Sequence, residues 1–185
     1  VGVEFDSKGI KVDENFETNV KGIYAIGDVI GRMLLAHVAS HHGISVAEHI
    51  MGIESKINHD VVPDCVFTFP EVAGVGITED AAKREGINYK TSKFLFVSNG
   101  KALSLGETEG FVKVIADEND YVIGVHIMGP HASDLIHEGT LAISNHLKVD
   151  DIAKTIHAHP TLSEAFDEAV LGINGKAIHM APLRS

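Results

Sequence analysis

The first part of the chain has the apolar spacing of a short strand followed by a long helix. Apolar residues recur at helical intervals over residues 34–50, and Gly52 follows where a helix commonly ends. Residues 22–28 favour β-structure and end in a glycine turn, which predicts a β-turn-α unit. A polar, irregular segment before Val61 places a domain boundary at about residue 58.

The second part, residues 59–185, has the pattern of an antiparallel sheet with helices. Runs of β-favouring residues predict strands at 64–69, 72–75, 89–97, 110–116 and 121–128. Apolar periodicity and capping residues predict helices at 79–85, over about four turns from 132, at 149–154 and at 162–171. Thr78 is a candidate N-cap, and Asp117–Asp120 is predicted to close a hairpin. Strands followed by helices are typical of an α+β domain.

Charge and composition narrow the classes of function. The 185 residues include 15 Lys and Arg against 26 Asp and Glu, a net charge of −11, which disfavours nucleic-acid binding. No apolar run approaches the roughly 20 residues of a membrane helix, so no membrane association is expected. The single cysteine, Cys65, excludes an intrachain disulfide and fits a reducing compartment, so we expect a cytoplasmic protein. The sequence opens at Val1 in strand-like residues without methionine, so we expect this chain to be a piece of a longer protein.

The segment His157-Ala-His-Pro-Thr-Leu-Ser-Glu164 has the most specific chemical pattern. In one interpretation Thr161 and Glu164 form a capping box, with Pro160 just before the helix. In the other, Glu164 reaches back from the first helical turn to the upstream imidazole, fixes its tautomer and raises its basicity. Both interpretations can hold, since a carboxylate has two oxygens.

Two further sets of residues are candidate sites. In Tyr24-Ala-Ile-Gly-Asp28 the aspartate follows a glycine turn, where it is either a cofactor contact at a strand end or an ordinary turn residue. His157 and His159 could both face a metal ion, but the sequence offers no third ligand at a recognised spacing. We therefore expect no metal site.

Four motifs in order carry a resemblance to a known family. They are Tyr24-Ala-Ile-Gly-Asp28, Thr68-Phe-Pro-Glu-Val-Ala73 with Val75-Gly76, His126-Ile-Met-Gly-Pro130, and His157-Ala-His-Pro-Thr-Leu-Ser-Glu164. The chain resembles the C-terminal part of the dihydrolipoyl dehydrogenases, a branch of the flavin-dependent pyridine nucleotide-disulfide oxidoreductases. Leu162 and Ser163 favour this branch over the glutathione reductases.

The resemblance implies roles for individual residues. Residues 1–58 would be the C-terminal segment of a Rossmann-like, FAD-binding core, and residues 59–185 the α+β dimerisation domain. Asp28 would bind the ribityl chain of FAD, and Leu34, Leu35 and Ala36 would lie beside the flavin ring. His159 would be the catalytic base for the opposite subunit, with Glu164 as its orienting partner and with a cis bond before Pro160.

The implied parent is a homodimer that oxidises the dihydrolipoyl groups of 2-oxoacid dehydrogenase complexes, passing electrons through FAD to NAD⁺. A disulfide reductase similar to glutathione reductase and a non-catalytic dimerisation module are the alternatives. The sequence contains neither the GxGxxG fingerprints nor the redox-active cysteine pair of the family. We therefore expect this chain alone to be inactive and to retain no cofactor.

Overall fold

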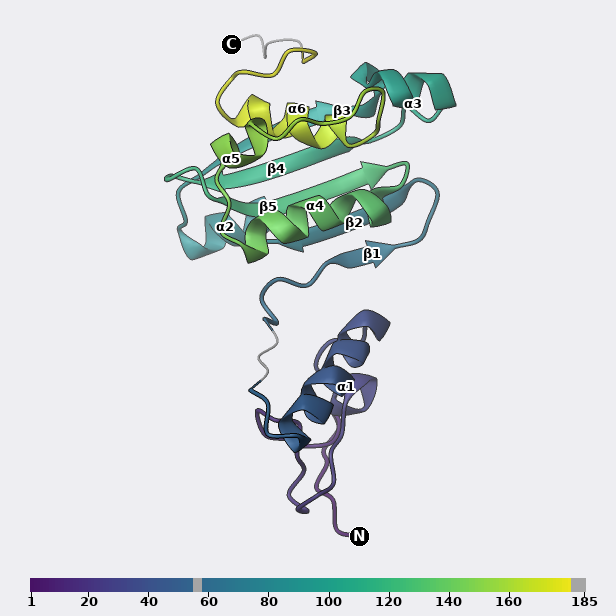
Figure 1. Ribbon diagram of the computed structural model, residues 1–185, viewed down its shortest axis with the longest axis vertical. Coiled ribbons are helices and arrows are strands. Elements are labelled where there is room, and N and C mark those ends of the chain that lie inside the picture. Colours follow the sequence, from purple (N-terminus) through teal and green to yellow (C-terminus); the bar gives the residue numbers. More distant parts are fainter. Residues whose placement is uncertain (55–57, 181–185) are drawn as a thin grey trace. The chain divides into compact units, whose positions relative to one another are not determined.

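The computed structural model describes residues 1–54 and 58–180 and separates into two compact units (Figure 1). The N-terminal unit is Val1–His59 and the C-terminal unit is Asp60–Ser185. Each unit is described by itself. None of the described helices is long and apolar enough to cross a membrane.

The N-terminal unit is built on one helix and a short 3-10 turn. Helix α1 (Ala36–Ile50) follows η1 (Gly27–Ile30), and Phe16, Ala25 and Ile30 form a small buried core. The predicted helix is confirmed, but it starts at Ala36 because Leu35 has an extended backbone with φ −131°. Gly52 follows the helix with a φ of +73°, as predicted.

The strand predicted for residues 22–28 is wrong. Tyr24 makes only an isolated bridge with Glu17, and the chain then turns into η1. A β-favouring run becomes a strand only where a neighbouring strand pairs with its backbone groups. Within the described residues of the N-terminal unit, the predicted strand makes an isolated bridge but does not pair with a continuous neighbouring strand.

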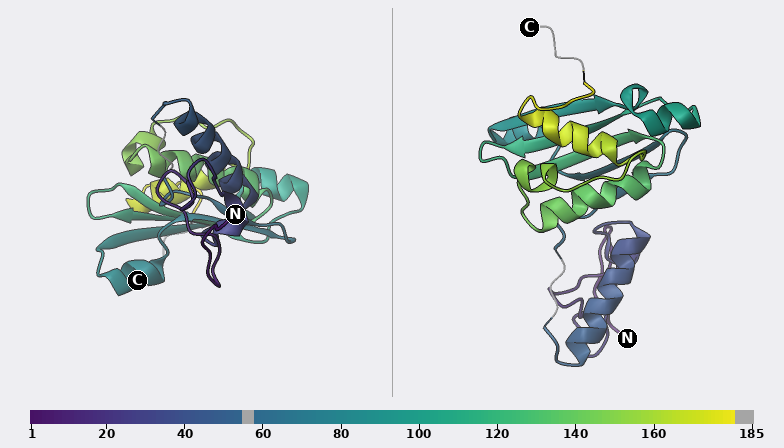
Figure 2. Two further views of the ribbon diagram at one scale, coloured as in Figure 1. Left: turned by 90° about the horizontal axis from the view of Figure 1, so that it is seen from below. Right: turned by 45° about the horizontal axis from the view of Figure 1, so that its top comes forward.

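The C-terminal unit is a five-stranded antiparallel sheet whose two longest helices, α4 (Ala132–Ser144) and α6 (Glu164–Ile173), pack on one face (Figures 1 and 2). Its strands are β1 (Asp64–Val66), β2 (Glu71–Gly76), β3 (Tyr89–Leu95), β4 (Phe111–Asp117) and β5 (Val122–Gly129), in the spatial order β1-β2-β5-β4-β3. The helices are α2 (Glu79–Glu85), η2 (Phe96–Ser98), α3 (Gly100–Leu105), α4 (Ala132–Ser144), α5 (Val149–Ala153) and α6 (Glu164–Ile173). The predicted α+β architecture is confirmed.

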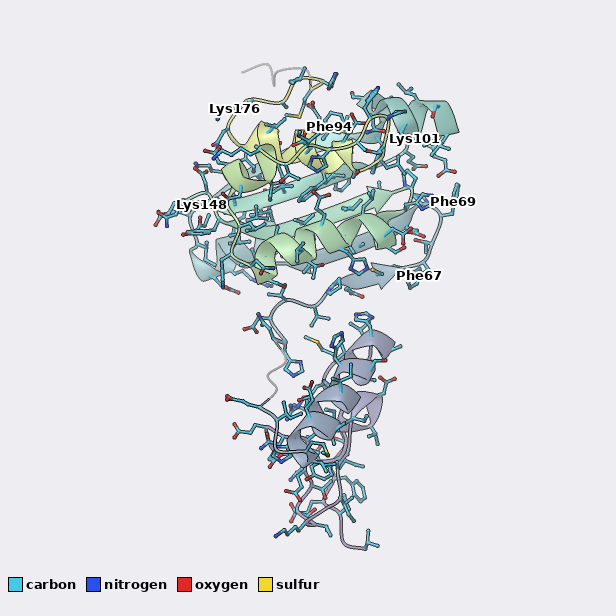
Figure 3. All side chains as sticks on the ribbon, viewed as in Figure 1. Phe67, Phe69, Phe94, Lys101, Lys148 and Lys176 are labelled. Carbon is cyan, nitrogen blue, oxygen red and sulfur yellow. The ribbon has the colours of Figure 1, made fainter. Side chains whose placement is uncertain are left out.

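The core lies between the sheet and the helices α4 and α6. Alternate residues of β4, including Val112 and Val114, are fully buried, and so is Phe94 of β3 at 1% exposure. Phe166 of α6 is also 1% exposed and belongs to the same apolar cluster. In contrast, Phe67 in the β1–β2 connection is 79% exposed and lies at the margin of the unit (Figure 3).

Local capping chemistry sets several of the observed ends. The Thr78 hydroxyl accepts the Ala81 N–H at 3.1 Å, which confirms the predicted N-cap of α2. The Asn99 side chain accepts the Ala102 N–H at 2.9 Å and caps α3, a helix that the sequence analysis missed because Asn99-Gly100 is typical of a turn. Helix α6 extends over Glu164–Ile173, so it begins and ends two residues later than the predicted helix at 162–171.

Candidate functional site

His159 and Glu164 lie within hydrogen-bond distance in the segment that leads into α6. His159 Nδ1 is 2.8 Å from Glu164 Oε1. The second oxygen, Oε2, accepts the Thr161 N–H at 2.8 Å. One carboxylate therefore holds the imidazole and closes the turn at the start of the helix.

The capping box is only half formed. Glu164 accepts the Thr161 N–H, but the Thr161 hydroxyl donates to the Ala158 carbonyl at 2.6 Å and lies 3.0 Å from Ser163 Oγ. The hydroxyl thus ties the turn to the residue before His159. The segment that carries His159 is fixed from both sides by these bonds.

The charge of Glu164 suits an orienting role. Burial by itself would raise its pKa, but hydrogen bonds from the Thr161 N–H and from His159 hold that pKa below its ordinary value. The carboxylate is thus ionised at neutral pH and only accepts, so His159 Nδ1 carries a proton. This tautomer leaves the Nε2 lone pair to take a proton from a substrate.

The His159 ring is reachable, because its side chain is 76% exposed against 27% for Glu164. A pocket of about 510 Å³ in the same unit is lined by other residues, among them Phe69, Glu109 and His131. The imidazole therefore lies on an open surface of this chain. Because His159 does not line this pocket, other groups would be needed to close a reaction site around the imidazole.

Three residues near this pair were missed by the sequence analysis. Asn99, 4% exposed, donates from Nδ2 to the Thr161 carbonyl at 3.0 Å. Glu138 of α4 and Asp167 of α6 lie 2.7 Å and 3.9 Å from the ring nitrogens of His157. Glu138 is 19 residues from His157, so no local spacing rule links them.

The two histidines of His157-Ala-His159 do not share a site. The His157 side chain is 7% exposed and His159 is 76% exposed, so the rings occupy different environments. Within residues 1–54 and 58–180, no group of three or more His, Cys, Asp and Glu is placed to hold a metal ion.

Asp28 lies in η1, and residues 34–36 lead into α1 of the N-terminal unit. Asp28 is exposed in η1, Leu34 is 68% exposed, Leu35 is half-buried and Ala36 is the exposed first residue of α1. Among the described residues, no side chain caps the start of α1. The arrangement fits a ligand with both hydroxyl groups and an apolar ring.

His42 supports this region and was also missed as a functional candidate. Its fully buried ring accepts the Gly27 N–H on Nδ1 at 3.2 Å and lies 4.4 Å from the Phe16 ring. Gly27 has a φ of +67°, and a Cβ there would meet Ala39 at 2.9 Å. The turn before Asp28 is thus fixed against α1.

Comparison with protein families identifies both parts of the chain. Residues 62–170 match the model described as "Pyridine nucleotide-disulphide oxidoreductase, dimerisation domain". Residues 1–43 match the model described as "Pyridine nucleotide-disulphide oxidoreductase".

The similar proteins agree with this match. The chain is 49% identical over 182 residues to "Dihydrolipoyl dehydrogenase 2, mitochondrial" of Arabidopsis thaliana, covering 97% of the chain and 36% of that protein. It is 50% identical over 172 residues to dihydrolipoyl dehydrogenase of Bacillus subtilis (strain 168), covering 92% and 36%. The crystal structure of LpdA from Mycobacterium tuberculosis is similar with a TM-score of 0.87 and 31% identity, covering 94% of this chain and 38% of LpdA.

The chain spans little more than a third of the length of these relatives. The family match nevertheless covers more than half of the chain itself, including the whole sheet of the C-terminal unit. This chain belongs to the pyridine nucleotide-disulphide oxidoreductase family.

Proposed function

We propose that this chain is the C-terminal part of a flavoprotein that oxidises protein-bound dihydrolipoyl groups with NAD⁺, and that His159 is its base. The observation that carries the proposal is the 2.8 Å contact between His159 Nδ1 and Glu164 Oε1 on an exposed segment. The names of the relatives at 49% and 50% identity supply the substrate class.

The chemistry requires a base because the substrate is a thiol. A free thiol has a pKa of about 8.5, so most of it is protonated at neutral pH. His159 Nε2 accepts the thiol proton, and the resulting thiolate attacks the redox-active disulfide of the enzyme. The Glu164 carboxylate stabilises the imidazolium that forms, because it already accepts from Nδ1.

Asp28 and residues 34–36 fit one half of FAD. The exposed carboxylate of Asp28 would accept from a ribityl hydroxyl, and exposed Leu34, just before α1, would contact the flavin ring. When bound, FAD carries the electron pair from the dithiol to NAD⁺. The GxGxxG fingerprint that would hold the adenylate half is not in these 185 residues. We therefore propose that this chain alone retains neither FAD nor NAD.

The same proposal assigns the two parts of the chain. Residues 1–58 would be the end of the FAD-binding core, and residues 59–185 the domain that forms the homodimer and brings His159 to the partner's disulfide. The lipoyl domains of 2-oxoacid dehydrogenase complexes would be the partners. We propose a cytoplasmic location for this chain. The Arabidopsis relative, in contrast, is named as mitochondrial.

We expect the chain to form a two-fold symmetric dimer through its C-terminal unit. Large apolar side chains are exposed there, including Phe69 at 89% and Leu141 at 63%, and such surfaces commonly mark interfaces. A stable interface should bury about 1,200 Å² or more in total. Sedimentation over a range of concentrations would show the dimer, and a monomer at the highest concentration would contradict it.

Turnover by the full-length enzyme tests the proposed function. We expect oxidation of dihydrolipoamide with NAD⁺ to be faster by at least two orders of magnitude than reduction of glutathione disulfide with NADPH. The reverse preference would support the glutathione-reductase alternative. An intact, flavin-loaded enzyme without either activity would favour a non-catalytic module.

A further inference from the structure

His157 is enclosed between two helices with an oxygen at each ring nitrogen. Nε2 lies 2.7 Å from Glu138 Oε1 of α4, and Nδ1 lies 3.1 Å from the Thr155 carbonyl oxygen. A carbonyl and an ionised carboxylate can only accept hydrogen bonds, and a neutral imidazole has one N–H. With Glu138 ionised, both contacts are hydrogen bonds only if the ring is an imidazolium.

The charges around His157 favour the same state. Asp167 Oδ1 of α6 lies 3.9 Å from Nδ1, is buried, and has no hydrogen-bond partner among the described residues. The neighbouring acids of α6, Glu164 and Glu168, add further negative charge around Asp167. A buried carboxylate oxygen without a hydrogen-bond partner is costly, and a cation beside it offsets that cost.

The pKa directions agree with this geometry. Burial alone would lower the pKa of His157, but the hydrogen bond and charge of Glu138, with the charge of Asp167, raise it above its ordinary value. Burial raises the pKa of Asp167, and the charge of His157 opposes that rise.

His157 also attaches the segment that carries His159 to the rest of the unit. A second attachment is Thr161, whose carbonyl accepts from buried Asn99 at 3.0 Å. His159 lies between these points and is two residues from His157, a separation of at most about 7 Å of extended chain. A displacement of His157 is therefore transmitted to His159 over a very short length of backbone.

We propose that Glu138 and Asp167 hold His157 as a buried imidazolium, and that this cation positions the segment that carries His159. The positioning half of the proposal rests on His159 being the base, as proposed above. His157 is a positioning residue, since its ring is enclosed by α4, α6 and its own segment.

The proposal has a defined pH dependence. The pKa of His157 is raised in the folded chain, and histidine in an unfolded chain has a pKa of about 6.5. Its contribution to stability is thus complete below about pH 6.5 and is lost as pH rises through the folded pKa. Deprotonation leaves Glu138, Asp167 and the Thr155 carbonyl with one N–H to share.

The charge state can be measured without catalysis, by a pH titration of the imidazole nitrogens of isotope-labelled histidine in this chain. We expect two protonated nitrogens on His157 at neutral pH, and a pKa about one pH unit lower after Asp167→Asn, because a nearby opposite charge stabilises a cation. The matched control is Asp134→Asn. It removes the exposed Asp134–His131 pair, at 3.1 Å, and should leave His157 unchanged. A single neutral tautomer of His157 at neutral pH would overturn the proposal.

The positioning role is tested in the full-length enzyme. His157→Gln keeps a donor for Glu138 without the charge, and we expect flavin reduction by dihydrolipoamide to slow ten- to a hundredfold, mainly in kcat, as for a misplaced catalytic group. Deprotonation of His157 should lower activity at high pH, and Asp167→Asn should move this loss to a lower pH. This variant provides the test if His157→Gln does not fold.

The outcomes separate the two proposals. If His159→Ala abolishes flavin reduction but both variants stay within twofold of the wild type across the pH range, positioning by His157 is wrong and the base stands. If His159→Ala itself has no effect, the base assignment fails and the positioning role fails with it. The titration then still decides whether His157 is an imidazolium.

Discussion

Replacing His159 by alanine in the full-length enzyme should slow flavin reduction by dihydrolipoamide by about 10² to 10⁴, the usual contribution of general acid–base catalysis. The variant removes the ring that takes the thiol proton, while its 76% exposed side chain contributes little to packing. Stopped-flow absorbance of the flavin measures this half-reaction directly. Folding and flavin content should remain those of the wild type.

Glu164→Ala should have a smaller effect on the same rate. It removes the acceptor for His159 Nδ1 but leaves the imidazole in place, and it also deprives the Thr161 N–H of its partner. The exposed His137 of α4 offers a matched control, since His137→Ala should leave the rate unchanged. His157→Ala is not a suitable control, because that ring is buried between Glu138 and Asp167. A His159→Ala enzyme within about threefold of the wild type would show that Glu164 acts only at the helix start.

Phe94→Ala should lower the free energy of unfolding of the C-terminal unit by about 3–5 kcal/mol, as is usual when a buried phenylalanine is truncated. Phe94 is 1% exposed in β3 and lies in the apolar cluster that also contains Phe166 of α6. The loss comes from apolar surface returned to water and from the cavity left in the core. Urea denaturation followed by circular dichroism measures it.

Phe67→Ala is the control for this substitution, because the same side chain is removed where it is 79% exposed (Figure 3). We expect its effect to stay within about 0.5 kcal/mol, as for other surface positions. Unfolding at two protein concentrations separates the stability of one chain from any contribution of Phe67 to a dimer. Equal losses for the two variants at low concentration would be inconsistent with the described core.

The C-terminal unit could be predicted well wherever its elements depend on neighbouring residues. The bounds of α2 follow from Thr78 and Gly86, the latter with a φ of +69°. The Asp117–Asp120 turn is confirmed, and there the Asp117 side chain accepts the Asn119 and Tyr121 N–H groups. The proximity of His159 and Glu164 was also predictable, because the first turn of a helix reaches back over the residues just before it.

The sequence by itself determined most of the strands and helices of the C-terminal unit, the alternation of strand residues and the family motifs, because each of these depends on short-range spacing. The strand order β1-β2-β5-β4-β3, the loss of the strand predicted at 22–28 and the enclosure of His157 by Glu138 and Asp167 were decided only by tertiary structure. Each of them depends on which segments distant in the chain become neighbours. A strand forms only beside a neighbouring strand that pairs with its backbone groups, and the charge of a buried imidazole depends on carboxylates that two helices bring to it.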